Sequence, residues 1–301
     1  MTSLPPPLHP GRLRTLQRLS WRLVRRTLGP FAGRSLSAWF GTGLDFAQVR
    51  EYQQGDDVRA IDWNVSARSG RWFVKEFIEE RHRNLFFCVD GSRSMRQGLE
   101  EDCGYRLALE VLAVFAWIAE GARDGLGAAV FTDRVEFERP IRCGELARKS
   151  LLFDLLRFEP CGRTWSLRSS VDHLTGALGR RATVFLISDF LSEESFEASL
   201  HRLKRHELIL LRVVDRWLQP RFVQELYGCS VRFEDAESGA RRTLRCDAEL
   251  CARVEAMNAQ LDRRLVLAAE AAGADLWTLR VGDDPIESLL ECLQRRSLRR
   301  R

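Results

Sequence analysis

The sequence predicts an α/β fold in which a mostly parallel sheet is covered by helices on both faces. Three short apolar segments, Leu85–Val89, Thr183–Ile187 and Leu208–Val214, suit strands buried on both sides. Segments of helical length separate them, and this alternation is typical of a doubly wound sheet. The 301 residues suffice for one such domain with an appended segment. We therefore place the domain at residues 83–301 and a separate N-terminal segment at residues 1–82.

The other elements of the domain follow from similar patterns. Pro140 indicates an edge strand, because proline cannot donate a ladder hydrogen bond. Two short segments with a turn between them predict a hairpin insertion near residues 220–246. Pro285, behind Asp283 or Asp284 as the cap, suits the first turn of the last helix. We expect helices near 102–121, 145–158, 167–180, 193–205, 247–272 and from 285, and further strands at 127–131, 135–141 and 275–281.

The N-terminal segment has a different character. Residues 12–28 predict a basic amphipathic helix, with leucines on one side and arginines on the other. Such a helix could dock on the domain, which we favour, lie on an anionic membrane or bind a partner, and a transit peptide has a similar composition. Residues 41–63 read as loop and turn, and residues 72–80 as a weak extended strand.

Charge and composition limit the function classes. The net charge of +5 comes from the chain ends: residues 1–44 contain seven arginines without an acidic residue, and the last ten residues contain five. The remaining body is acidic, so a nucleic-acid partner is not expected. Eight cysteines without a CxxC pair, and no apolar stretch of membrane-spanning length, favour reduced thiols in a cytoplasmic protein. Peripheral contact of residues 12–28 with the inner membrane stays open.

Oxygen-bearing side chains follow the predicted strands where a parallel sheet binds its ligands, at the carboxyl ends. Asp90, Ser92 and Ser94 follow the first strand, Thr164 precedes a helix, and Asp189 follows the Thr183–Ile187 strand. Hard oxygen ligands of this kind favour Mg²⁺, or alternatively Mn²⁺ or Ca²⁺. The absence of Cys and His from the set argues against zinc or copper. An Asp-x-Ser-x-Ser sequence alone is more commonly a turn or a helix cap.

The same residues resemble the metal-ion-dependent adhesion site of von Willebrand factor A domains. Upstream, residues 49–68 are similar to the signature of the bacterial domain of unknown function 58 family, which carries such a domain. The resemblance implies a Rossmann-like von Willebrand A-type fold. It also assigns a metal-ligand role to the aspartates, serines and threonine, with one coordination position left for an Asp or Glu of a partner. Family members are often encoded beside a MoxR-type AAA+ ATPase, so the resemblance implies that partner and unknown client proteins.

One departure from the family pattern concerns the Thr164 loop, which reads Gly-Arg-Thr-Trp where relatives often have Gly-Gly-Thr-Asp. Arg163 and Arg93 near the site would repel a cation or assist an acidic partner. Thr132 and Asp133, at another strand end, are expected to form a structural turn, with a substitute ligand as the alternative.

The upstream signature contains a charged and aromatic set. As structure, its charges would form a network that attaches the N-terminal segment to the domain, which we favour; as function, they would form a docking face for a partner. The residues are Arg50, Tyr52, Gly55, Asp56, Asp57, Arg59, Asp62, Trp63 and Arg68.

Three functions remain. The sequence has no P-loop and no Gly-x-Ser-x-Gly motif, and Ser92 stands where aspartyl phosphotransferases need a second carboxylate. We therefore expect a non-catalytic, metal-dependent interaction module that acts as an adaptor with a MoxR-type ATPase in protein assembly or remodelling. The alternatives are a Mg²⁺-dependent phosphohydrolase and, less favoured, a nucleic-acid binder that uses the basic ends.

Overall fold

The structure is a computed structural model that describes residues 48–53, 61, 63–76, 83–99, 102–191, 196–235 and 239–299. The predicted amphipathic helix at 12–28 lies outside these residues.

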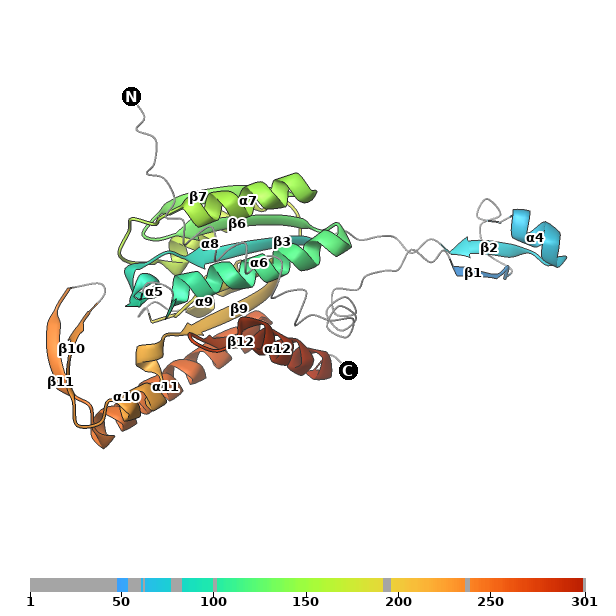
Figure 1. Ribbon diagram of the computed structural model, residues 1–301. Helices are drawn as coiled ribbons and strands as arrows, with labels where there is room; N and C mark the ends of the chain where they lie inside the picture. Colours follow the sequence, from blue (N-terminus) through green and yellow to red (C-terminus); the bar gives the residue numbers. More distant parts are fainter. Residues whose placement is uncertain are drawn as a thin grey trace, which may run out of the picture.

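A six-stranded sheet forms the centre of the domain (Figure 1). Its order is β12-β9-β8-β3-β6-β7, and only β7 runs antiparallel to its neighbour. Counted along the chain, this is the 3-2-1-4-5-6 order of doubly wound folds. The predicted von Willebrand A-type α/β fold is therefore confirmed. The strands are β3 (Asn84–Asp90), β6 (Gly125–Phe131), β7 (Val135–Arg142), β8 (Thr183–Ser188), β9 (Glu207–Val214) and β12 (Asp275–Arg280).

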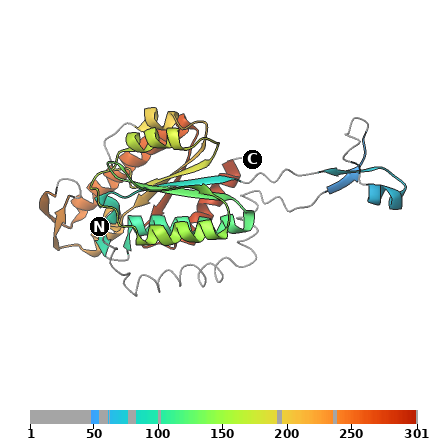
Figure 2. The same ribbon diagram turned by 90° about the horizontal axis from the view of Figure 1, so that it is seen from above.

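Helices cover both faces of the sheet, as Figure 2 shows. Strand β3 explains why: Leu85 and Phe87 pack into one apolar cluster, and Phe86 and Cys88 into the other, because alternate side chains point to opposite faces. The first cluster includes side chains of α6 (Gly104–Ala122), α7 (Glu145–Arg157) and α12 (Pro285–Arg299). The second includes side chains of α8 (Leu167–Ala177), α9 (Phe196–His201) and α11 (Ala248–Ala272).

The predicted boundaries hold where capping chemistry fixed them. Asp284 caps α12, because its Oδ1 accepts from the Ile286 N–H at 2.7 Å and from the Glu287 N–H at 3.2 Å. Gly273 ends α11 in the left-handed conformation that glycine tolerates best. The short elements after β3 were not expected: α5 (Arg93–Arg96), β4 (Gly98–Leu99) and β5 (Asp102–Cys103). They are too short to show a periodicity in the sequence.

The predicted hairpin insertion is present between β9 and α11. The chain passes through the 3-10 helix η3 (Arg216–Leu218) and α10 (Pro220–Glu225) before β10 (Ser230–Glu234) pairs antiparallel with β11 (Arg241–Arg245). A small apolar cluster under the hairpin attaches it to the start of α11. It contains Val223, Cys246, Leu250 and Cys251.

The N-terminal unit consists of β1 (Gln48–Glu51), α4 (Trp63–Ser69) and β2 (Phe73–Glu76). The prediction of loop throughout residues 41–63 is wrong at β1, whose antiparallel partner β2 lies more than twenty residues further along the chain. Tyr52 packs edge-on against Trp72, with ring centroids 5.7 Å apart.

The described members of the signature belong to this unit. Arg50 pairs with Val74 in the β1–β2 ladder, whereas Trp63 and Arg68 of α4 are exposed. The members outside the described residues, for which the predicted charge network stays a prediction, are Gly55, Asp56, Asp57, Arg59 and Asp62.

All eight cysteines have free thiols in the structure. None of the described helices is both long enough and apolar enough to cross a bilayer.

Candidate metal centre

A cleft of about 920 Å³ opens at the carboxyl ends of β3 and β8. These strands are neighbours in the sheet, and the direction of winding reverses between them, which is where doubly wound folds bind ligands. All five residues predicted as metal ligands line this cleft: Asp90, Ser92, Ser94, Thr164 and Asp189.

Asp90 ends β3 and is 1% exposed. Its Oδ1 accepts a hydrogen bond of 2.7 Å from the Ser92 N–H, and its Oδ2 accepts one of 2.6 Å from the Ser188 hydroxyl. Both carboxylate oxygens are therefore held in place. Ser188 is the last residue of β8, and its role depends on the pairing of β3 with β8, which no local sequence pattern indicates.

The two serines of the first loop lie together, with hydroxyl oxygens 3.0 Å apart. The tight turn that brings them there needs Gly91, because a Cβ at this position would lie 2.7 Å from Val130 Cγ1 and 3.0 Å from Pro160. The backbone of this short motif passes close to neighbouring elements, and both serines line the cleft.

Asp189 follows β8 and is 7% exposed, with Oδ1 accepting from the Leu191 N–H at 3.1 Å. Burial, together with the charge of Asp189, raises the pKa of Asp90 to about 7. Burial also raises the pKa of Asp189. Two buried carboxylates that repel each other favour a proton or a cation between them.

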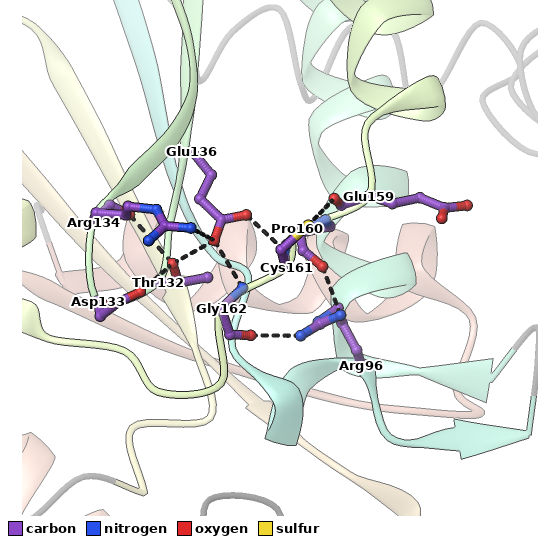
Figure 3. A network of polar contacts seen from close by, with 9 residues as sticks. All are labelled: Arg96, Thr132, Asp133, Arg134, Glu136, Glu159, Pro160, Cys161 and Gly162. Atoms are coloured by element: carbon purple, nitrogen blue, oxygen red, sulfur yellow. Dashed lines mark hydrogen bonds and ion pairs between the residues drawn. The ribbon is translucent and has the colours of Figure 1, made fainter. Parts of the chain in front are cut away.

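The loop that carries Thr164 is clamped from both sides (Figure 3). Glu136 accepts hydrogen bonds of 2.7 Å from the N–H groups of Cys161 and Gly162, and Arg96 donates to the carbonyl oxygens of Pro160 and Gly162 at 2.7 and 2.6 Å. This clamp fixes the path of the chain up to Thr164, whose side chain is exposed on the cleft wall.

Thr132 has the structural role expected of it. Its hydroxyl is buried, 2.8 Å from Glu136 Oε1 and 3.0 Å from Asp133 Oδ1. A Cβ on Gly162 would lie 2.3 Å from this hydroxyl, so the loop can pass here only with a glycine. Asp133 itself is exposed and lines the cleft.

Residues distant in the sequence complete the cleft. Arg93, which we expected to act on a cation or on an acidic partner, forms an ion pair of 2.9 Å with Glu234 of the hairpin. Arg163 is exposed. Asp215, which follows β9, and Trp217 also line the cleft. Pairing of β8 with β9 brings them there, and no local sequence signal could have indicated it.

The donor set suits a hard divalent cation. Among the described residues, no three His, Cys, Asp or Glu side chains form a cluster that could hold a metal ion. The set instead combines two buried carboxylates with serine and threonine hydroxyls, all of them oxygen donors. Mg²⁺ accepts few protein ligands because it retains water molecules, so these residues fit it.

The doubly wound sheet, with carboxylates and hydroxyls gathered in a cleft at its winding reversal, is the arrangement that the resemblance to von Willebrand A-like domains implied. A family model described as "Protein of unknown function DUF58" matches residues 48–264. The chain belongs to this family.

The relatives and solved structures match between 15% and 89% of the chain. An uncharacterized protein of Mycobacterium tuberculosis is 30% identical over 275 residues, covering 89% of this chain and 84% of the relative. The uncharacterized Bacillus subtilis protein YeaD is 48% identical over 44 residues, 15% of this chain and 11% of the relative. The conserved hypothetical protein BatB from Bacteroides thetaiotaomicron has 12% identity and a TM-score of 0.44, covering 72% of this chain and 99% of BatB. A von Willebrand factor type A protein from Catenulispora acidiphila has 12% identity and a TM-score of 0.39, covering 71% of this chain and 42% of that protein.

Proposed function

We propose that this protein is a non-catalytic interaction module that binds an acidic side chain of a partner protein through a divalent cation. The observation that supports this most directly is the meeting of Asp90 and Asp189, buried and mutually repelling, with serine hydroxyls at one cleft. The carboxylates would balance the charge of Mg²⁺, and Ser92, Ser94 and Thr164 would donate oxygen ligands. The bound ion would supply one coordination position to a carboxylate from outside.

The chain's own groups prepare this site for binding and not for turnover. Hydrogen bonds from the Ser92 N–H and the Ser188 hydroxyl orient Asp90, and the clamp of Glu136 and Arg96 fixes the loop before Thr164. No general base or nucleophile was identified in the sequence, and this supports the proposal of a module without catalytic activity.

The wider role is also a proposal. Membership of the family supports an adaptor that acts with a MoxR-type AAA+ ATPase on client proteins during assembly or remodelling. A cytoplasmic location stays a prediction. Peripheral membrane contact through residues 12–28 also stays a prediction, because that segment lies outside the described residues.

Calorimetric titration with Mg²⁺ tests the site. The wild type should bind the ion, and Asp90→Ala and Asp189→Ala should abolish binding. Asp172→Ala is the matched control, because Asp172 pairs with Arg202 on the surface, outside the cleft. Unchanged Mg²⁺ binding in both cleft variants would remove the proposed site.

A pull-down from the native cell, with Mg²⁺ or with a chelator, tests the partner. The ATPase should be retained only with Mg²⁺ and only by protein with an intact Asp90. Retention that is the same in chelator would contradict a metal-mediated contact.

A further inference from the structure

The cleft carries more negative charge than a divalent cation at Asp90 and Asp189 would balance. Its described walls contain four further acidic side chains and one arginine: Asp133, Asp215, Glu234, Asp235 and Arg232. Glu234 is paired with Arg93 and Arg241. A segment that brought only carboxylates would therefore meet like charge around the metal position, and like-charge contacts select against a partner.

Asp215 is an acidic group of the cleft with an uncompensated oxygen. Its Oδ1 accepts from the Trp217 N–H at 3.1 Å, whereas its Oδ2 is shielded from solvent and has no hydrogen-bond partner among the described residues. Burial, helped by the charge of Asp189, raises the pKa of Asp215 to about 6. An uncompensated buried carboxylate is costly, and a cation close to it would reduce that cost.

Trp217 adds an aromatic surface beside this carboxylate. The side chain is 37% exposed, and its ring is held edge-on by Phe222 at 4.6 Å and Phe233 at 5.8 Å between centroids. Tryptophan is the aromatic residue that attracts ammonium and guanidinium groups best. A carboxylate and an indole that line one cleft offer complementary contacts to a cationic side chain.

We infer, on the basis of the proposed function, that the cleft takes a partner segment of mixed charge. An Asp or Glu of the segment coordinates the metal ion, and a Lys or Arg close to it in sequence binds between Asp215 and Trp217. The spacing is suitable, because Asp189 and Asp215 follow neighbouring parallel strands, whose axes lie about 4.8 Å apart, and the register places Asp215 two residues further along its strand. Two or three residues of an extended segment, at about 3.3 Å each, span the resulting separation of about 8 Å.

Fluorescence anisotropy with three labelled peptide amides tests the inference on the full-length protein in Mg²⁺. Each peptide has one central aspartate, flanked on both sides by lysine, by norleucine or by glutamate. The lysine peptide should bind tightest and the glutamate peptide weakest. Asp215→Asn should weaken the lysine peptide about tenfold and change the norleucine peptide much less, as expected for a partly buried charge pair.

Two further variants locate the effect. Trp217→Leu should also weaken the lysine peptide selectively. Asp133→Asn is the matched control: Asp133 lines the same cleft, but its Oδ1 already accepts from Thr132, and the variant should change the lysine and norleucine peptides by similar factors.

The outcomes separate the two claims. If the peptides bind only in Mg²⁺ but lysine gives no advantage, or Asp215→Asn affects all three equally, the mixed-charge inference is wrong and the metal-mediated function stands. If no peptide shows Mg²⁺-dependent binding, the proposed function fails and the inference fails with it.

Discussion

Burial of Asp90 and Asp189, which suits them to hold the proposed cation, makes their charged forms costly when no cation is bound. The ordinary pKa of an aspartate is 3.8, and burial with a neighbouring charge raises that of Asp90 to about 7. Between pH 3.8 and about pH 7, Asp90 of the unfolded chain has released its proton, whereas Asp90 of the metal-free folded protein still holds it. The free energy of unfolding should therefore fall as the pH rises from about 4 to about 7.

Asp90→Asn should reduce this pH dependence in chelator and make the metal-free protein more stable than wild type at pH 8. The reason is that the asparagine carries no charge to bury, while Asp189 keeps its own contribution. Urea denaturation at pH 4.5 and pH 8 in chelator measures both effects. A wild-type protein that gains stability over this range would contradict the assignment.

Gly162 offers a test of the loop clamp. Gly162→Ala should cost about 1–3 kcal/mol of unfolding free energy, because the new methyl group would overlap the buried Thr132 side chain. Mg²⁺ affinity should fall as well, since the loop carries Thr164. Gly176→Ala is the control: this helical glycine has open space around it, so the same change should leave stability equal or slightly higher. Equal effects at the two positions would show that the loop is not tightly packed.

At the scale of elements, the strands and helices of the domain were largely predictable, and their exceptions are instructive. The buried strands show as apolar segments because both faces of the sheet are covered. Strand β1 is not visible in the sequence as an apolar segment, because its four residues pair with a distant strand and carry no local pattern.

The β10–β11 hairpin should depend on its contact with Arg93 in the loop that follows β3. In Arg93→Ala the ion pair with Glu234 is lost, and amide hydrogen exchange should become faster in residues 230–245 but not in α11. Arg241→Ala is the comparison, because Arg241 also binds Glu234 but belongs to the hairpin itself. Both groups of the Arg93–Glu234 pair are partly exposed, so global stability should change little. Unchanged exchange in Arg93→Ala would show that the apolar cluster alone holds the hairpin.

For the whole molecule, a ligand that binds only the folded state must stabilise it. Mg²⁺ at a hundred times its dissociation constant should add about 2.7 kcal/mol to the unfolding free energy. Thermal denaturation with and without Mg²⁺ measures this, and Asp90→Ala should abolish the difference. A melting temperature insensitive to Mg²⁺ would contradict binding at the cleft.

The charged signature before the domain keeps its own prediction. If Asp57 takes part in a network that holds the N-terminal segment, Asp57→Ala should speed proteolysis between residues 40 and 80. Limited proteolysis followed by mass spectrometry measures the cleavage. Resistance equal to that of wild type would favour the docking-face interpretation.

Sequence alone determined the order of the main strands and helices and marked Asp90, Ser92 and Ser94 as candidate donors, because apolar periodicity and a five-residue loop are local properties. It also placed Thr164 and Asp189 at the same edge, since parallel strands end together. Only the tertiary structure decided that Ser188 orients Asp90 and that Asp215 and the hairpin surround the site. Those contacts depend on which strands lie side by side, and the packing of the whole chain sets that arrangement.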